Sequence, residues 1–127
     1  MKVFVCIDEK NGMLFNKRRL SKDKAVIEKI ASFLKLSPIF VSEYSKKILP
    51  YGIVVEDFNK GNNFAFIENP KDLPNEIEMF YVFNWNRHYP SDTKLEFDFT
   101  DYDIVSVEDF IGNSHENITL TIYKKKG

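Results

Sequence analysis

The stretch KVFVCI, at residues 2–7, decides which fold the rest of the sequence can adopt. Its residues are β-branched, aromatic or otherwise apolar after Lys2, without the alternation of apolar and polar residues that marks a half-exposed strand. Such a run predicts a strand that is buried on both faces, and strands of that kind lie in the middle of a sheet. We therefore expect residues 2–7 at the centre of an α/β sheet.

The longest helical pattern follows this strand. Between Lys22 and Leu36 apolar side chains recur at intervals of three and four residues, which predicts one amphipathic helix. Ser21 is the expected N-cap, and Pro38 ends the pattern. The preceding residues 8–20 contain the turn dipeptide Asn11-Gly12 and are expected to form an ordered loop.

Short strands with few helices are expected over the rest of the chain. A Gly/Asn-rich turn is expected at residues 59–63, a short helix at 42–48 and a connector containing two prolines at 68–78. The further predicted strands cover residues 39–41, 52–55, 64–67, 79–85, 102–107 and 118–123. Because the last of them follow one another without a helix, the sequence predicts a mostly parallel mixed sheet with antiparallel C-terminal strands, in one domain of residues 1–127.

Composition excludes several classes of protein. The chain has 127 residues with 18 Lys plus Arg against 19 Asp plus Glu, so no bulk positive charge attracts nucleic acid. No stretch approaches the ~20 apolar residues of a membrane helix, and no secretory leader is recognisable. Cys6 is the only cysteine, which excludes an internal disulfide and a cysteine-based zinc site. We expect a cytoplasmic protein that uses neither membrane, nucleic acid nor metal.

Both ends of the sequence resemble dihydrofolate reductase. That family opens with a buried strand, a loop containing an Asn/Asp-Gly turn and a helix that starts Leu-x-x-Asp; it closes with two strands around a hairpin bearing Asn-Ser-His. The matching segments here are Val3–Ile7, Asn11-Gly12, Leu20–Asp23, Val105–Phe110, Asn113–His115 and Ile118–Lys124. The chain also looks like short bacterial proteins with segments such as WNRHYP at residues 85–90. The resemblance implies a dihydrofolate-reductase-like α/β fold.

The resemblance also implies a role for Asp23. The acid at this position of the family contacts a pterin ring, and Ile7 and Ile27 are the neighbouring wall positions that carry over. The alternative is an ordinary helix-start aspartate, which interacts favourably with the helix dipole by roughly 0.3–1 kcal/mol. Arg18-Arg19 replaces the Pro-Trp that precedes the family motif.

The cofactor site of the family is not recognisable in this sequence. Where the family has Gly-Gly and a helix whose backbone N–H groups receive pyrophosphate, this chain has Glu68-Asn69-Pro70. A carboxylate repels phosphate, proline lacks an N–H, and a Cβ prevents close approach of the backbone. We expect no NADPH and no other cofactor.

The segment WNRHYP combines an indole, a guanidinium, an imidazole and a phenol at the end of a predicted strand. Such mixtures are enriched at binding surfaces, so Trp85, Arg87 and His88 are candidate ligand contacts, as is Arg19 in the basic loop. The alternative is a packed Trp85 beside a solvated Arg87. Ser114-His115-Glu116 offers catalytic groups, but neighbours in a hairpin point to different sides, so hairpin polarity is the favoured interpretation of His115.

These observations favour a non-enzymatic ligand-binding or regulatory module. Its ligand is expected between Asp23, the loop of residues 11–19 and the turn of residues 85–89. The first alternative is a reductase-like enzyme with a pterin- or pyrimidine-like pocket in which Asp23 is catalytic. The second is a protein-interaction domain, including a homodimer. The sequence leaves open whether the protein is an enzyme and which small molecule or protein is its partner.

Overall fold

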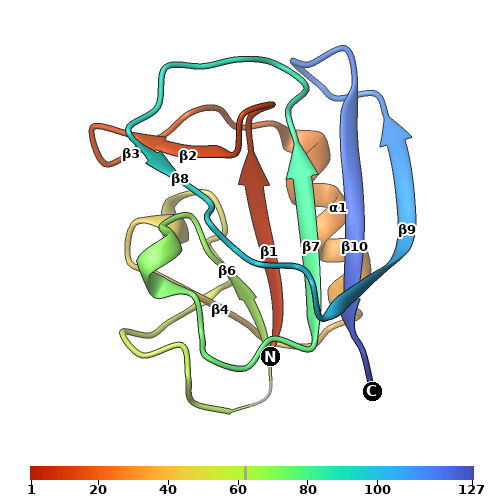
Figure 1. The fold of residues 1–127 in the computed structure, drawn as a ribbon. Coiled ribbons are helices and arrows are strands. Elements are labelled where there is room, and N and C mark those ends of the chain that lie inside the picture. The colour runs from red at the N-terminus through yellow and green to blue at the C-terminus, as the bar shows by residue number, and fades with distance from the viewer. Residues whose placement is uncertain (62) are drawn as a thin grey trace.

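The computed structural model describes residues 1–61 and 63–127. Its main feature is a seven-stranded sheet in the order β5-β4-β6-β1-β7-β10-β9, with one long helix, α1 (Lys24–Leu34), packed on one face (Figure 1). The strands of this sheet are β1 (Lys2–Ile7), β4 (Ile39–Val41), β5 (Ile53–Val54), β6 (Phe64–Phe66), β7 (Met79–Asn84), β9 (Tyr102–Phe110) and β10 (Ile118–Lys125). A smaller sheet has the order β3-β2-β8, from β2 (Gly12–Phe15), β3 (Arg18–Arg19) and β8 (Thr93–Lys94).

The first strand lies where its sequence places it, between β6 and β7 and parallel to both. Parallel pairing continues from β6 to β4 and from β4 to β5. On the other side, β10 runs antiparallel to β7 and to β9. The prediction of a mostly parallel sheet with antiparallel C-terminal strands is therefore confirmed.

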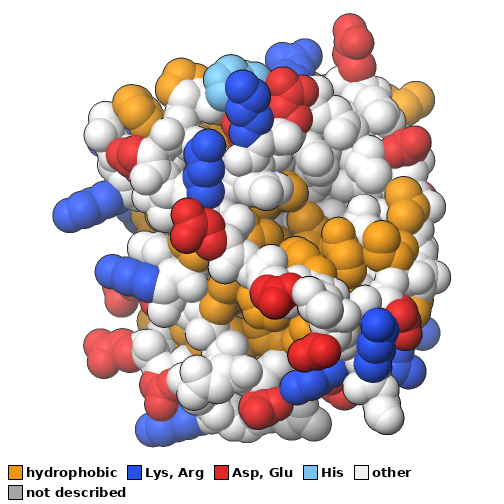
Figure 2. Space-filling view, in the orientation of Figure 1, with side chains coloured by type: hydrophobic (Ala, Val, Ile, Leu, Met, Phe, Trp, Pro, Cys, Tyr) orange, Lys and Arg blue, Asp and Glu red, His pale blue; other side chains and the backbone are white. Residues whose placement is uncertain are grey.

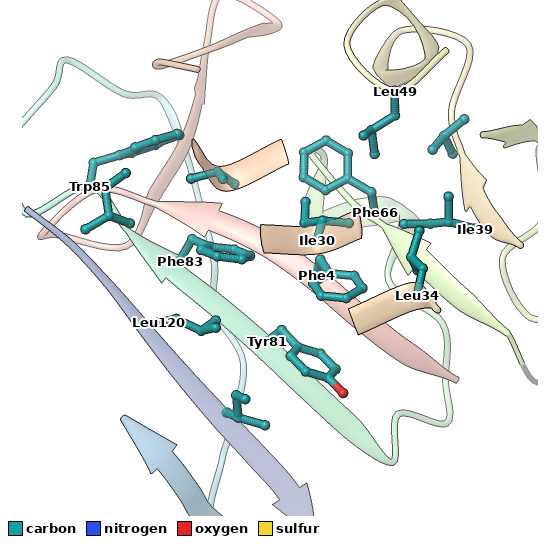
Figure 3. Close-up of a cluster of buried hydrophobic side chains, with 14 residues drawn as sticks. Phe4, Ile30, Leu34, Ile39, Leu49, Phe66, Tyr81, Phe83, Trp85 and Leu120 are labelled. Atoms are coloured by element: carbon teal, nitrogen blue, oxygen red, sulfur yellow. The ribbon is translucent and has the colours of Figure 1, made fainter. Parts of the chain in front are cut away.

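Alternate side chains of β1 fill two separate cores. Phe4 is fully buried beneath α1 and stacks on Tyr81 with 4.5 Å between the ring centroids, while Val3 and Val5 are fully buried on the opposite face. Ile30 and Leu34 of α1 pack into the first core, which Figure 3 shows spread over β1, β6, β7 and β10. Burial on both faces explains why the strand contains no polar alternation.

Among residues 1–61 and 63–127, no helix of comparable length covers the face of the sheet opposite α1. The segment that connects β7 to β9 crosses it, and Phe97 and Phe99 of that segment pack on Phe80. Beside this segment Figure 2 shows a broad group of hydrophobic side chains at the surface. The edge strand β9 contributes exposed apolar residues, among them Ile104 and Val107. This edge of the sheet is considered below as a possible contact area.

Several local predictions were wrong in detail. The expected loop 8–20 contains β2 and β3, because Met13 and Leu14 are buried and pair with neighbouring segments. The N-cap of α1 is Asp23 and not Ser21, and the helix is shorter than residues 22–36. The short helix expected at 42–48 is one 3-10 turn, Ser45–Lys47, and a second such turn, Pro70–Asp72, lies in the expected connector.

Other differences concern the strands and one turn. Strand β9 extends to Phe110, three residues beyond the predicted end, and β8 was not predicted at all. The turn expected at 59–63 includes residue 62, which lies outside the described residues. In the part of the chain that is described, no helix has the length and apolarity needed to cross a membrane.

Truncation of a fully buried side chain of α1 is expected to destabilise the fold strongly. Ile30→Ala removes buried methyl groups between the helix and the sheet and leaves a cavity, which costs about 2–5 kcal/mol. Leu36→Ala is the control, since this equally apolar side chain is fully exposed and its truncation is expected to change the free energy of unfolding by no more than about 0.5 kcal/mol. Urea unfolding of both variants measures the difference, and equal effects would contradict the assignment of the core.

Candidate functional site

The candidate site lies where residues 18–23 pass from β3 into α1. Asp23 has an extended backbone conformation, and its Oδ1 atom accepts a hydrogen bond of 2.8 Å from the backbone N–H of Ala25. This is ordinary N-cap chemistry, in which an aspartate satisfies a backbone donor that the first helical turn leaves free. The cap fixes the direction of the Asp23 carboxylate.

The same carboxylate holds the hairpin between β9 and β10. Oδ1 accepts a bond of 2.8 Å from the backbone N–H of Asn113, and Oδ2 accepts bonds of 2.8 Å from the N–H of Ser114 and 3.2 Å from its hydroxyl. Oδ2 also lies 2.8 Å from Nδ1 of His115. The acceptor capacity of Asp23 is therefore used within the chain, and its side chain is almost fully buried.

These contacts determine the charge of Asp23. Burial by itself raises the pKa of the carboxyl, but hydrogen bonds from Asn113, His115 and the neighbouring backbone outweigh burial and hold the pKa well below its ordinary value of 3.8. The group is ionised at neutral pH and has no proton to donate. Nδ1 of His115 must therefore carry the hydrogen of their shared bond.

His115 is buried among three further side chains. Its ring stacks on the indole of Trp85 with 4.6 Å between the centroids and an angle of 24° between the planes. On its outer side Nε2 lies 2.9 Å from the hydroxyl oxygen of Ser21 and 3.1 Å from that of Tyr89. The imidazole consequently links the start of α1, the turn after β7 and the β9–β10 hairpin.

A second polar cluster surrounds Glu68 at the end of β6. Arg19 donates from Nε and from a terminal nitrogen to the two oxygens of Glu68, at 2.8 and 3.0 Å. The buried Ser45 hydroxyl also donates to Glu68, at 2.8 Å, and the Arg19 guanidinium lies over the ring of Tyr44. A bidentate pair of this kind restricts both side chains. The positive charge of Arg19 also offsets the negative charge of Glu68, the carboxylate that was expected to repel phosphate.

Asp8 organises the turn after β1. Its carboxylate accepts from the backbone N–H groups of Lys10, Gly12 and Tyr89, at 2.9, 2.7 and 3.0 Å, and lies 3.6 Å from His88. Burial raises the pKa of Asp8, but these backbone donors outweigh burial and lower it. A Cβ at position 12 would stand 2.6 Å from the Ser91 hydroxyl, which explains the glycine there.

Several hollows among the described residues share parts of the 18–24 segment. One enclosed pocket between α1 and β1 has a cavity volume of about 20 Å³, room for a single water molecule, and is lined by Arg19, Ser21, Asp23, Ile27, Trp85 and other residues. A wider groove of about 610 Å³, open to solvent, is lined by Arg18, Arg19, Ser21, Lys22, Tyr44 and Lys47. We call this second hollow the basic groove. Ser21 borders both.

The structure brings together some of the residues that sequence singled out. Arg19, Asp23, Ile27 and Trp85 line the enclosed pocket. Ile7 belongs to the core on the other face of the sheet, so β1 does not present it there.

The two polar residues of the turn after β7 lie apart from the pocket lining. Arg87 is exposed, and His88 is half-exposed beside Asp8. Sequence analysis missed Ser21 and Tyr89 as site residues and assigned His115 to hairpin polarity, because their contacts join segments up to 94 residues apart.

Cys6 also borders the enclosed pocket, but it is not a reactive thiol. Burial raises the pKa of Cys6, and the nearby negative charge of Glu68 raises it further, while Arg19 opposes them only partly. The thiol is therefore protonated at neutral pH.

Loss of the Asp23 charge is expected to weaken the fold in a pH-dependent way. A carboxyl whose folded pKa is depressed stabilises the protein above its unfolded pKa, near 3.8, and that contribution is lost as the pH falls below this value. Asp23→Asn turns an amide NH₂ towards buried donors, so we expect about 3 kcal/mol lower stability at pH 7 and a smaller difference at pH 3.

Urea unfolding at a series of pH values measures this effect. Asp101→Asn is the control, because Asp101 is exposed and its side chain forms no hydrogen bond or ion pair within the described residues. If the two variants differ from the unsubstituted protein equally at every pH, Asp23 does not hold the hairpin as an ion.

Comparison with known proteins shows the fold. No protein-family model matches this sequence, and no curated protein matches it. Among solved structures the chain is similar to the dihydrofolate reductase from Enterococcus faecalis complexed with NADP(H) and RAB-propyl, with a TM-score of 0.64 and 8% sequence identity over 99% of this chain and 96% of that one. The chain therefore has a dihydrofolate-reductase-like fold, as the motifs at its two ends predicted.

Proposed function

We propose that this protein is a ligand-binding module that uses the dihydrofolate-reductase-like fold to hold a small anionic molecule in the basic groove. The observation that carries the proposal is the charge of the groove lining. Arg18, Lys22 and Lys47 are exposed around it, and within the described residues no carboxylate is recorded as an ion-pair partner of any of them. Arg19 is the lining cation whose charge Glu68 already offsets.

The shape of the groove fits a ligand with both a charged and a flat part. Tyr44 offers a ring beside the cations, and the neighbouring hollow adds Phe15, Leu20 and Tyr89. Ligand sites commonly combine such apolar walls with a few convergent polar groups. A phosphate or carboxylate near Arg18 and Lys22, with a planar group over the exposed ring of Phe15, satisfies both features.

The geometry gives less support to a reductase. A pterin held by Asp23 needs a free carboxylate oxygen, whereas the recorded hydrogen bonds already occupy both oxygens. Beyond β6 the chain places Glu68, bound to Arg19 and Ser45, where the family's cofactor glycines would be expected. The catalytic role of Asp23 stays a prediction, and these contacts favour a positioning role for this residue.

One observation favours the interaction hypothesis as a second candidate. Strand β9 is a nine-residue sheet edge on which Ile104 is 59% and Val107 61% exposed. Long exposed apolar edges are sites at which a second chain adds to a sheet. Analytical ultracentrifugation over a hundredfold range of concentration tests for a homodimer. A dimer through β9 is expected to give a mass that rises with concentration in the unsubstituted protein and not in Val107→Lys. A monomeric mass for both proteins at every concentration argues against this candidate.

Removal of two groove cations is expected to weaken anion binding. Inorganic pyrophosphate, NADP and dihydrofolate, titrated calorimetrically at low ionic strength, are suitable ligands because they carry the charge and flat groups that the groove fits. Arg18→Ala/Lys22→Ala is expected to raise the dissociation constant of those that bind by tenfold or more, equivalent to about 1.4 kcal/mol, and added salt is expected to have a similar effect.

The matched control is Lys124→Ala/Lys126→Ala, which removes the same charge from the exposed C-terminal end. Equal loss of affinity in both double variants would show that net charge and not the groove attracts the anion. If the unsubstituted protein binds none of the three compounds, the proposed function is wrong.

A further inference from the structure

Three side chains, of which Ser21 lines the basic groove, form a hydrogen-bonded series with the geometry of a nucleophilic site. Ser21 Oγ lies 2.9 Å from Nε2 of His115, and Nδ1 of the same ring lies 2.8 Å from Oδ2 of Asp23. In serine hydrolases this order of groups, hydroxyl, imidazole and carboxylate, is recognised by geometry and not by sequence position. Here Ser21 and Asp23 are two residues apart, and His115 comes from the distant hairpin.

The protons of this series are in the positions that a nucleophile requires. The Asp23 carboxylate accepts from the backbone on both oxygens, so it orients His115 with the hydrogen on Nδ1. The Nε2 lone pair then faces the hydroxyls of Ser21 and Tyr89. A general base must lie within hydrogen-bond reach of the proton that it abstracts, and Nε2 meets this condition for Ser21.

The surroundings fix the base and leave the nucleophile accessible. Only 5% of His115 is exposed, and the Trp85 ring covers one face of the imidazole. Ser21 is half-buried and borders both the enclosed pocket and the basic groove. A substrate can therefore approach Ser21 while the base stays shielded from bulk water.

Two backbone donors without an acceptor in the chain are also present at this place. The backbone N–H groups of Ser21 and Lys22 form no hydrogen bond within the described part of the chain. The Tyr89 hydroxyl is not one of these free donors, because in this tautomer its proton points to Nε2 of His115. Donors near a developing oxyanion are usually the largest single contribution to acyl-transfer catalysis.

We propose that Ser21 is the nucleophile of an ester-cleaving site, with His115 as general base and Asp23 as the positioning residue, and that its substrates are small esters with a carboxylate or phosphate group. The charge of the substrate rests on the function proposed above for the basic groove. The chemistry rests on the three side chains alone.

The reaction has two balanced halves. Ser21 Oγ forms a bond to the ester carbonyl carbon while its proton moves to Nε2 of His115; the bond to the leaving oxygen then breaks, and that oxygen takes the proton from Nε2. Water next attacks the acyl-serine and gives a proton to Nε2, and Ser21 recovers this proton as the acid leaves. The products are one acid and one alcohol from one ester and one water.

A neutral fluorophosphonate tests the nucleophile without the basic groove. The fluorophosphonate is expected to add once per chain at pH 8, peptide mapping is expected to place the adduct on Ser21, and Ser21→Ala is expected to abolish the label. His115→Gln is expected to slow labelling at least 100-fold. Ser106→Ala, which removes an exposed serine of β9, is the matched control and is expected to react at the original rate.

The role of Asp23 is judged from the pH profile and not from the loss of rate alone. The labelling rate of the unsubstituted protein is expected to rise between pH 5 and 8, as a general base loses its proton, and the rise is expected to be absent in Asp23→Asn. Near-UV circular dichroism confirms that each variant compared is folded. If a variant is unfolded, the comparison of the unsubstituted protein with Ser21→Ala still decides on the nucleophile.

Ester hydrolysis then tests the substrate class. The 4-nitrophenyl hemisuccinate, an anionic ester, is expected to have a kcat/KM at least tenfold above that of neutral 4-nitrophenyl acetate, and Arg18→Ala is expected to remove the preference. If Ser21 is labelled but the anionic ester is not preferred, Ser21 remains the nucleophile and the proposed role of the basic groove in substrate binding is wrong. If the folded, unsubstituted protein is labelled no faster than Ser21→Ala, the assignment of Ser21 as the nucleophile is wrong. This conclusion is independent of whether the basic groove binds pyrophosphate.

Discussion

The fold around the candidate site depends on one buried carboxylate. Asp23 caps α1 through Ala25, receives the backbone of the β9–β10 hairpin through Asn113 and Ser114, and bonds to His115. A buried charge is tolerated only where hydrogen bonds replace its lost hydration. Because the donors belong to segments about 90 residues apart in sequence, the carboxylate couples the start of the helix to the far edge of the sheet.

This coupling gives the imidazole of His115 a defined position and a defined tautomer. A histidine on an exposed hairpin would sample many orientations, but Asp23 and the Trp85 ring hold this one in a single plane. A buried histidine with a purely structural role would also need one partner for Nε2. The two hydroxyls at its outer nitrogen, one of them from a residue that borders two hollows, are what distinguish the arrangement from hairpin polarity.

The main sheet was predictable from sequence because burial on both faces leaves a strong local pattern. The run KVFVCI and the alternation of Ile118, Leu120 and Ile122 each determine the place of a strand without reference to the rest of the chain. The short strands β3 and β8 carry no such pattern, since each has only two residues and is held by its neighbour.

The site was less predictable because its contacts join segments far apart in sequence and leave no local pattern. The identity of Asp23 as an important residue came from the resemblance, but its partners came from the hairpin and could not be deduced from spacing. Ser21 was assigned as a cap because serine before a helical pattern is typical of one. The cap is taken by Asp23, and the serine hydroxyl is thereby left free to reach Nε2 of His115.

The Arg19–Glu68 pair determines how charge is distributed beside the proposed basic groove. A lone Glu68 beyond β6 would repel phosphate, whereas the bidentate contact with Arg19 cancels this charge and fills the space with a guanidinium stacked on Tyr44. Arg18, Lys22 and Lys47 line the groove together with Tyr44, and within the described residues no ion pair joins any of them to a carboxylate. An anion attracted to them, as proposed above, would arrive next to Ser21, because Ser21 lines the same groove.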